Sequence, residues 1–272
     1  MEVKENNFIE DLAQEVKDVG IAKKENWLEK KDQEKINNII DELNCSKGDI
    51  RGIFSAELKS RVIEILKFKF KKTQQFFYFK NLSKKLGLNK IADKIFNAPS
   101  RLLRVDCYIS SPSNEPVLQW HLDNAYSGRT DVKKFVHPQK NSIKFFFYLT
   151  DVGTENGCLG YIPYSHKIAF FLKEGIYLKL LNYTPYWKLG DFRKAILIEE
   201  NYKYILSKID SNILEKFLAN AKTKITEKDS IFDHPVKAGG AVIFDEAGCH
   251  RGSKVSKTPR KVLRFFYLRN TQ

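Results

Sequence analysis

Several common signatures are missing from this sequence. It has four cysteines, and no two of them form a Cys-x-x-Cys pair. A zinc site or a dithiol centre built from paired cysteines is therefore not indicated. Widely separated cysteines are typical of reduced thiols in a cytosolic protein, so we expect a cytoplasmic location. The four are Cys45, Cys107, Cys158 and Cys249.

The chain also lacks long apolar segments. Met1 is followed by charged and amide residues, which argues against a secretory signal. The longest apolar runs, such as Phe145–Leu149, are far too short to cross a bilayer. We therefore expect no transmembrane segment, while contact with a membrane surface stays open.

Acidic residues do not balance the basic ones. The 47 Lys and Arg against 33 Asp and Glu give a formal net charge of +14. Such a balance favours anionic partners, although an ordinary solvated surface explains it equally. The lysines are spread without a long basic run, and no nucleic-acid-binding module is evident. We expect an anionic small-molecule substrate and no nucleic acid.

The hydrophobic periodicity changes near residue 100. Residues 1–100 have mainly helical spacing, whereas residues 101–166 and 236–272 consist of short apolar segments separated by turns. Between these two parts, residues 167–235 return to helical spacing. We predict one domain over residues 1–272, mainly β with flanking helices (α+β), with a closed or double-sheet β core. The helical insertion would be a substrate lid or a structural flap.

Two details of the N-terminal part are less regular. A short strand is expected near Val19–Ala22. The aromatic run Phe76–Phe79 fits either a strand or the end of a helix, and in both cases we expect it in the core.

One stretch, Gln119–Asp123, contains a candidate metal-binding pair. Because side chains alternate along a strand, His121 and Asp123 project to the same side. A third imidazole from a distant strand would complete two histidines and one carboxylate on one face of a metal. This arrangement leaves open positions and is that of non-haem Fe(II) oxygenases. His250 is our candidate for the third ligand.

Four ordered segments resemble the phytanoyl-CoA dioxygenase-like (PhyH) branch of the Fe(II)/2-oxoglutarate-dependent oxygenases. Trp120–Asp123 is similar to the family's His-x-Asp pair, and Leu149–Leu159 to its strand and Glu-Asn-Gly turn. Ile162–Lys167 resembles its Pro-Gly-Ser-His-Lys segment. Lys237–Arg260 resembles the closing strand, the distal histidine and the oxoglutarate-binding arginine.

The resemblance implies a double-stranded β-helix, the cupin-like jelly roll, and the cofactors Fe(II), 2-oxoglutarate and O2. His121, Asp123 and His250 would be the metal ligands and the catalytic residues. The reaction would convert 2-oxoglutarate to succinate and CO2 while hydroxylating an unactivated carbon. Acidic sugars, phosphorylated compounds, lipid-linked glycans and natural-product intermediates are substrates that suit the basic composition.

An arginine is expected to bind the far carboxylate of 2-oxoglutarate, because a guanidinium pairs with a carboxylate through two hydrogen bonds. The resemblance assigns this role to Arg260, ten residues after His250. Arg264 lies four residues further on, on the same strand face, and is the alternative. Further candidates for the cofactor site and pocket are Ser253, Gln119, Tyr108 and Lys144.

The sequence departs from the family pattern in three places. Tyr164 stands where a glycine is usual, so we expect a different turn there and a tyrosine near the pocket. The interval from His250 to Arg260 is about one residue shorter than in the family pattern, so the choice between Arg260 and Arg264 as the 2-oxoglutarate-binding arginine stays open. The insertion matches no family member whose substrate could be transferred, which argues against a coenzyme A substrate.

Two alternatives stay open. The same iron-based oxidant could perform desaturation, ring closure or epimerisation in place of hydroxylation. A protein of another class would keep the cupin-like scaffold without catalysis and bind nucleic acid or an anionic membrane through its basic surface. The intact triad with a following arginine argues against the second alternative.

Overall fold

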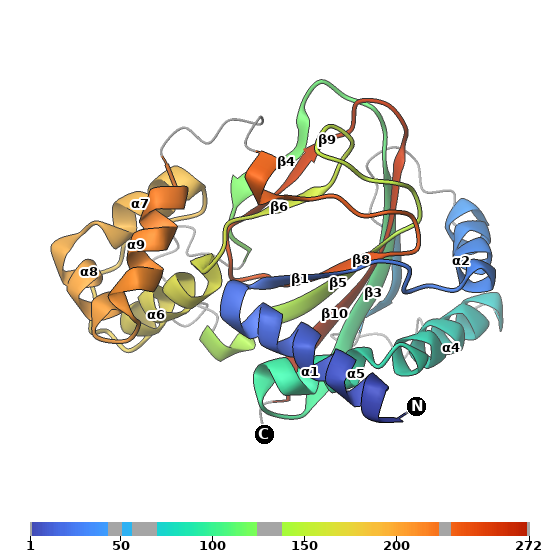
Figure 1. Cartoon of the computed structure of the whole chain (residues 1–272), viewed down its shortest axis with the longest axis horizontal. Helices are drawn as coiled ribbons and strands as arrows, with labels where there is room; N and C mark the ends of the chain where they lie inside the picture. Colours follow the sequence, from blue (N-terminus) through green and yellow to red (C-terminus); the bar gives the residue numbers. More distant parts are fainter. Residues whose placement is uncertain (1, 43–50, 56–69, 124–137, 223–229, 271–272) are drawn as a thin grey trace.

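The computed structural model describes residues 2–42, 51–55, 70–123, 138–222 and 230–270. Cys45 lies outside these ranges. Two antiparallel sheets form the centre of the molecule (Figure 1), with the strand orders β1-β8-β5-β10-β3-β2 and β4-β9-β6-β7. The strands are β1 Ile21–Lys24, β2 Arg51–Ser55, β3 Ser100–Ser110, β4 Pro116–His121, β5 Ser142–Tyr148, β6 Leu159–Tyr161, β7 Asp233–His234, β8 Ala241–Asp245, β9 His250–Lys254 and β10 Arg260–Arg269.

The sheets share a buried interior. Tyr148 of β5 and Phe244 of β8, in the larger sheet, pack in one cluster with Leu159 and Tyr161 of β6, in the smaller sheet. The mixed α+β architecture confirms the predicted fold class, and two antiparallel sheets around a shared interior are consistent with the jelly roll. The short strand predicted near residue 20 is present as β1.

The N-terminal helices cover the outer face of the larger sheet. Alternation along β5 explains why: Phe145 and Phe147 join the cluster shared with these helices, whereas Phe146 joins the interior cluster. Both faces of β5 are therefore buried, which accounts for the apolar run Phe145–Tyr148 within it. The helices are α1 Glu2–Val19, α2 Lys30–Glu42, α4 Phe70–Lys85 and α5 Leu88–Phe96. The aromatic run Phe76–Phe79 is helical, within α4, and the expectation that it lies in the core was wrong for Phe77: helical periodicity buries Phe79 and leaves Phe77 exposed.

The insertion forms a separate helical layer at one end of the sheets (Figure 1). Its apolar side chains pack against Trp120, Leu122 and Cys249, which lie in or beside β4 and β9 of the smaller sheet. The helices are α6 Ser165–Tyr177, α7 Leu189–Ile196, α8 Glu199–Leu206 and α9 Ser211–Asn220. Short 3-10 turns at Pro138–Lys140 and Ser230–Phe232 complete the described elements.

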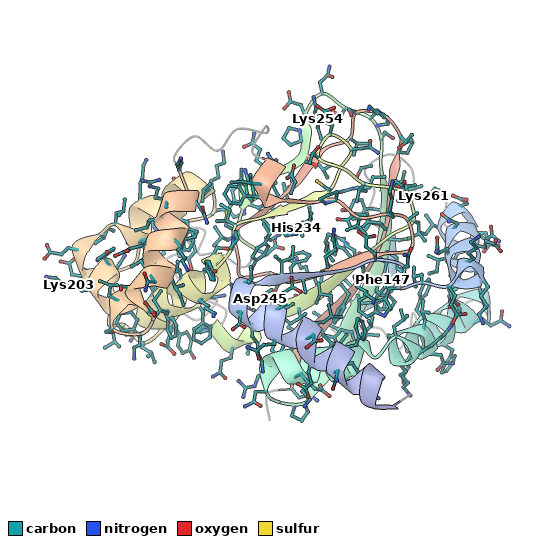
Figure 2. All side chains as sticks on the ribbon, in the orientation of Figure 1. Phe147, Lys203, His234, Asp245, Lys254 and Lys261 are labelled. Atoms are coloured by element: carbon teal, nitrogen blue, oxygen red, sulfur yellow. The ribbon has the colours of Figure 1, made fainter. Side chains whose placement is uncertain are left out.

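No helix in the described ranges is long and apolar enough to cross a membrane. The cysteines within those ranges, Cys107, Cys158 and Cys249, are free and buried. Lys203 lies on the helical layer, far from Lys254 and Lys261 on the other side of the molecule (Figure 2).

Tyr164, just before α6, adopts a backbone conformation that favours glycine. Its φ is 68°, in the left-handed region. Contrary to the expectation from the sequence, the turn therefore does not change to suit the tyrosine. Tyr164 itself adopts the glycine-type conformation, which strains the backbone. For a residue with a Cβ atom this conformation costs about 1–2 kcal/mol.

We therefore expect Tyr164→Gly to be more stable than Tyr164→Ala by about 0.5–1 kcal/mol. Both variants lose the aromatic ring, so their difference isolates the backbone strain. Urea unfolding of the two variants gives the two free energies of unfolding. An alanine variant as stable as the glycine variant would contradict the strain.

Candidate metal centre

Two strands of the smaller sheet bring the predicted histidines together. His121, the last residue of β4, pairs directly with His250, the first residue of β9. Their ring centroids are 4.4 Å apart. The register of the pair shifts between Leu118 and His121, so β4 carries one residue more than β9 there. Such a bulge re-aims the side chains that follow it.

Asp123 completes the group from the turn after β4. One carboxylate oxygen lies 3.4 Å from Nε2 of His121, and the other lies 3.4 Å from Nε2 of His250. One ligand atom from each of the three residues lies within 4.8 Å of the others. The structure therefore brings together the three side chains that the sequence singled out.

The main chain sets the protonation of both imidazoles. Nδ1 of His121 lies 2.7 Å from the carbonyl of Gln119, and Nδ1 of His250 lies 2.8 Å from the carbonyl of Gly248. A carbonyl only accepts, so in each neutral ring the proton is on Nδ1 and the lone pair is on Nε2. Burial lowers the pKa of His250 and favours the neutral ring. Two neutral imidazoles and one carboxylate with converging lone pairs fit an Fe(II) site.

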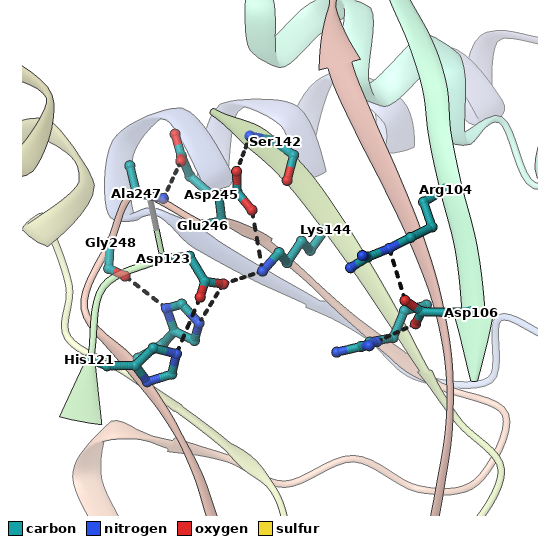
Figure 3. A network of polar contacts seen from close by, with 12 residues as sticks. Arg104, Asp106, His121, Asp123, Ser142, Lys144, Asp245, Glu246, Ala247 and Gly248 are labelled. Carbon is teal, nitrogen blue, oxygen red and sulfur yellow. Dashed lines mark hydrogen bonds and ion pairs between the residues drawn. The ribbon is translucent and has the colours of Figure 1, made fainter. Parts of the chain in front are cut away.

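A buried lysine holds the carboxylate of the triad (Figure 3). Lys144 on β5 donates to Asp123 and pairs with Glu246 at 3.2 Å. Glu246 is itself fixed by the main-chain N–H of Ser142, at 2.7 Å. Burial opposes both charges, but the Lys144 ammonium lowers the pKa of Asp123 well below its usual range. Glu246 and Asp123 likewise outweigh burial and raise the pKa of Lys144.

The sequence indicated only part of this network. Lys144 was a pocket candidate, and the structure places it against Asp123. Glu246 was missed. The only available signal was an acidic residue directly after the apolar strand that precedes His250, and turn residues of that kind are common.

Arg260 lies between the sheets with its charge facing neutral groups. Its side chain donates to the carbonyl of Gly157 at 2.6 Å, the hydroxyl of Tyr108 at 2.6 Å and the hydroxyl of Ser110 at 3.3 Å. Gly157, in the Glu-Asn-Gly turn, has φ 78°, and a Cβ there would lie 2.8 Å from Cδ of Arg260. The glycine thus makes room for the arginine. In the described part of the chain, Arg260 is hydrogen-bonded only to neutral groups.

Arg264 lies on the same face of β10 but has a carboxylate partner. It donates to the fully buried Asp106 at 2.5 Å, and both arginines lie over the ring of Tyr108. Among the described residues, Nε of Arg260, Nη2 of Arg264 and the hydroxyl of Tyr148 are buried without a hydrogen-bond partner. Buried donors usually have partners, so this group leaves hydrogen bonds for a polar ligand.

Ser253 and Gln119, the two other candidates for the cofactor site, make no hydrogen bond to the triad through their side chains in the described structure. The hydroxyl of Ser253 donates to the carbonyl of Cys158 at 3.0 Å. The side chain of Gln119 is exposed, because the bulge interrupts the alternation that would align it with His121, and only its carbonyl supports the site. Their predicted contacts with the cofactor stay predictions.

Comparisons with known proteins agree with this geometry. The family model described as phytanoyl-CoA dioxygenase (PhyH) matches residues 16–262. A search of curated proteins returns no match. The chain is similar in fold to several solved structures, with the following overlaps.

The epimerase SnoN, in complex with Fe3+, alpha ketoglutarate and nogalamycin RO, is 15% identical with a TM-score of 0.54, covering 97% of this chain and 84% of that one. The carbocyclase SnoK from nogalamycin biosynthesis is 14% identical with a TM-score of 0.55, covering 95% and 83%. HygX from Streptomyces hygroscopicus, with nickel and 2-oxoglutarate bound, is 15% identical with a TM-score of 0.53, covering 96% and 87%.

Asp245, at the end of β8 behind the triad, is a second carboxyl group with a shifted pKa. Burial of the carboxyl group, with Glu246 nearby, raises its pKa to about 7, although one oxygen accepts a hydrogen bond from the N–H of Ala247. Between about pH 4 and pH 7 the unfolded chain has released this proton while the folded chain keeps it. The free energy of unfolding therefore falls as pH rises through this window.

We expect Asp245→Asn to remove this part of the pH dependence. Relative to the variant, the native protein should lose roughly 2–4 kcal/mol of stability from pH 4 to pH 7 and nothing further above it. Urea unfolding at several pH values measures the difference, with the exposed Asp191→Asn as the matched control. Parallel profiles for the native protein and Asp245→Asn would show that folding does not raise the pKa of this carboxyl group.

Proposed function

Because the chain belongs to the phytanoyl-CoA dioxygenase (PhyH) family, an assignment that makes it an Fe(II)/2-oxoglutarate-dependent enzyme, we propose that it hydroxylates an unactivated carbon of a small or medium-sized anionic metabolite. The observation that carries the proposal is the group of His121, Asp123 and His250, in which both histidines are buried and the ligand atoms converge. Three protein ligands on one face leave positions for the co-substrates.

We propose a role for each residue of the site. His121, Asp123 and His250 hold the iron through two Nε2 atoms and a carboxylate. Bound iron and 2-oxoglutarate supply O2-dependent oxidation of a C–H bond, with release of succinate and CO2. Lys144, itself held by Glu246, keeps Asp123 in place by donating a hydrogen bond to its carboxylate.

Arg260 is proposed to bind the far carboxylate of 2-oxoglutarate. A buried guanidinium with neutral partners carries an uncompensated charge, and an anionic ligand would neutralise it. Arg264 is less suited because it already pairs with Asp106, a carboxylate that it shares with the partly exposed Arg104. Phe146 and Phe244, which pack against each other with Phe244 beside His250, would keep water from the reacting atoms.

We also propose that residues 1–272 act as one domain in which the insertion at 167–235 is a substrate lid. The packing of its helices on Trp120 and Leu122 supports this. A cytoplasmic location is likewise proposed, supported by the free, buried cysteines.

A second candidate reaction has specific support. Solved structures with this fold include proteins described as an epimerase and a carbocyclase. The same oxidant could therefore perform epimerisation or ring closure here, and desaturation is a further outcome of that class. Mass and stereochemical analysis of the product separates these reactions, because only hydroxylation adds one oxygen atom.

The first test is an anaerobic titration with Fe(II) and 2-oxoglutarate, followed by the visible charge-transfer band of the chelate. We expect a band in the native protein and no band in His121→Ala. The metal affinity of this variant should fall by more than the roughly 10–100-fold that is typical when a residue hydrogen-bonded to a metal ligand is removed, because His121 is itself a ligand. The exposed Glu199→Gln, remote from the triad, is the control.

A folded native protein without the band would contradict the proposal. Steeply salt-dependent binding of nucleic acid, with no 2-oxoglutarate consumed, would then favour the non-catalytic alternative.

The two arginines are separated by conservative variants. We expect Arg260→Lys to weaken 2-oxoglutarate binding by roughly 10–100-fold, since a lysine loses the paired hydrogen bonds. Arg264→Lys should change it by less than about threefold, as should the exposed Arg101→Lys control. Affinities come from the same titration at saturating Fe(II). A larger loss in Arg264→Lys would transfer the role to Arg264.

A further inference from the structure

One extended piece of the insertion runs beside the metal centre. The carbonyl of Trp187 accepts a hydrogen bond from the N–H of Leu122 at 3.0 Å. Lys188 forms an antiparallel bridge with His121. The main chain of the insertion is therefore attached to His121 and to Leu122, the residue between the ligands His121 and Asp123.

Tyr186 and Trp187 differ sharply in exposure. Tyr186 is 2% exposed and packs on Phe192, with ring centroids 5.3 Å apart, inside the helical layer. Trp187 is 47% exposed, and its ring centroid lies 6.2 Å from that of His121. Neighbouring residues of an extended chain point to opposite sides, so the burial of Tyr186 directs Trp187 outward. The indole is thus held beside a metal ligand and open to solvent.

A cavity beside the triad has little space. It is lined by Asp123, Lys173 and Tyr186 and has a volume of about 10 Å³. That is room for about one water molecule, not for a metabolite. Among the described residues near the triad, the exposed indole of Trp187 offers a larger surface for contact with a substrate.

We propose that Trp187 is a substrate-binding residue that stacks against a flat ring of the substrate. This inference rests on the proposed function. An indole offers a large, rigid, apolar face with few rotatable bonds, and it gains most contact from a partner that is also flat. The C–H face of a sugar ring and an aromatic ring share this shape, whereas a linear acyl chain does not. Trp187 thereby selects ring-bearing substrates and places them beside His121.

The test uses 19F NMR of the full chain labelled with 5-fluorotryptophan. The chain has three tryptophans, so the spectrum has three signals, and Trp187→Phe identifies the signal of Trp187. Paramagnetic Co(II) should shift this signal, while diamagnetic Zn(II) should leave it near its metal-free position. A signal that Co(II) does not shift would contradict the metal centre itself and hence the proposed function.

The substrate step is tested separately on protein loaded with Zn(II) and 2-oxoglutarate. The probes are three neutral compounds: methyl α-D-glucopyranoside, benzyl alcohol and hexan-1-ol. We expect at least one ring probe to shift the Trp187 signal saturably, and the responding ring shows whether a sugar or an aromatic face is preferred. Hexan-1-ol should produce no such shift.

Variants complete the design. With the responding probe followed by calorimetry, Trp187→Phe should retain binding within about threefold, and Trp187→Leu should weaken it about tenfold, because only leucine removes the aromatic face. Both variants should bind Co(II) as the native protein does, which shows that the site is folded. Normal Co(II) binding with no response to either ring probe, or an equal response to hexan-1-ol, would overturn the inference and leave the metal centre intact.

Discussion

The antiparallel pairing of His121 with His250 is the contact on which the metal centre depends. It joins the end of one strand to the start of another, and the residue two positions before each histidine supplies the carbonyl that fixes its ring. Both imidazoles are therefore oriented by local main chain, and only Asp123 relies on a distant side chain. A sheet contact of this kind tolerates a long insertion between its strands, because the register is set by the ladder and not by the connection.

Charge balance divides the interior into two regions. Near the triad, Lys144 is matched by Asp123 and Glu246, and further along β10 Arg264 is matched by Asp106. Arg260 has neutral hydrogen-bond partners in the described structure. A ligand that binds only the folded state stabilises that state. An anion at Arg260 would therefore raise the free energy of unfolding of the protein as well as take part in the reaction.

The sequence predicted those site residues whose positions follow from local spacing along one strand. It predicted few of those whose positions depend on how the strands pair. The spacing of His121 and Asp123 was sufficient to identify the ligand pair, and the faces of Arg260 and Arg264 follow from simple alternation. Simple alternation would also put Gln119 on the same face as His121. It fails there because of the bulge in β4, which no residue type in the sequence indicates. Glu246 and Trp187 were beyond reach, because their neighbours come from segments distant in sequence.

The position of β10 has a consequence for how the protein is made. This strand lies between β5 and β3 in the larger sheet, yet it follows both of them in the sequence by more than 100 residues and is synthesised well after them. Until β10 is made, β3 and β5 each expose the edge that it will cover, and pairing between segments so far apart in sequence is slow. The nascent chain therefore carries apolar strands without their central partner during this interval, a state in which chaperones would have the greatest effect on yield.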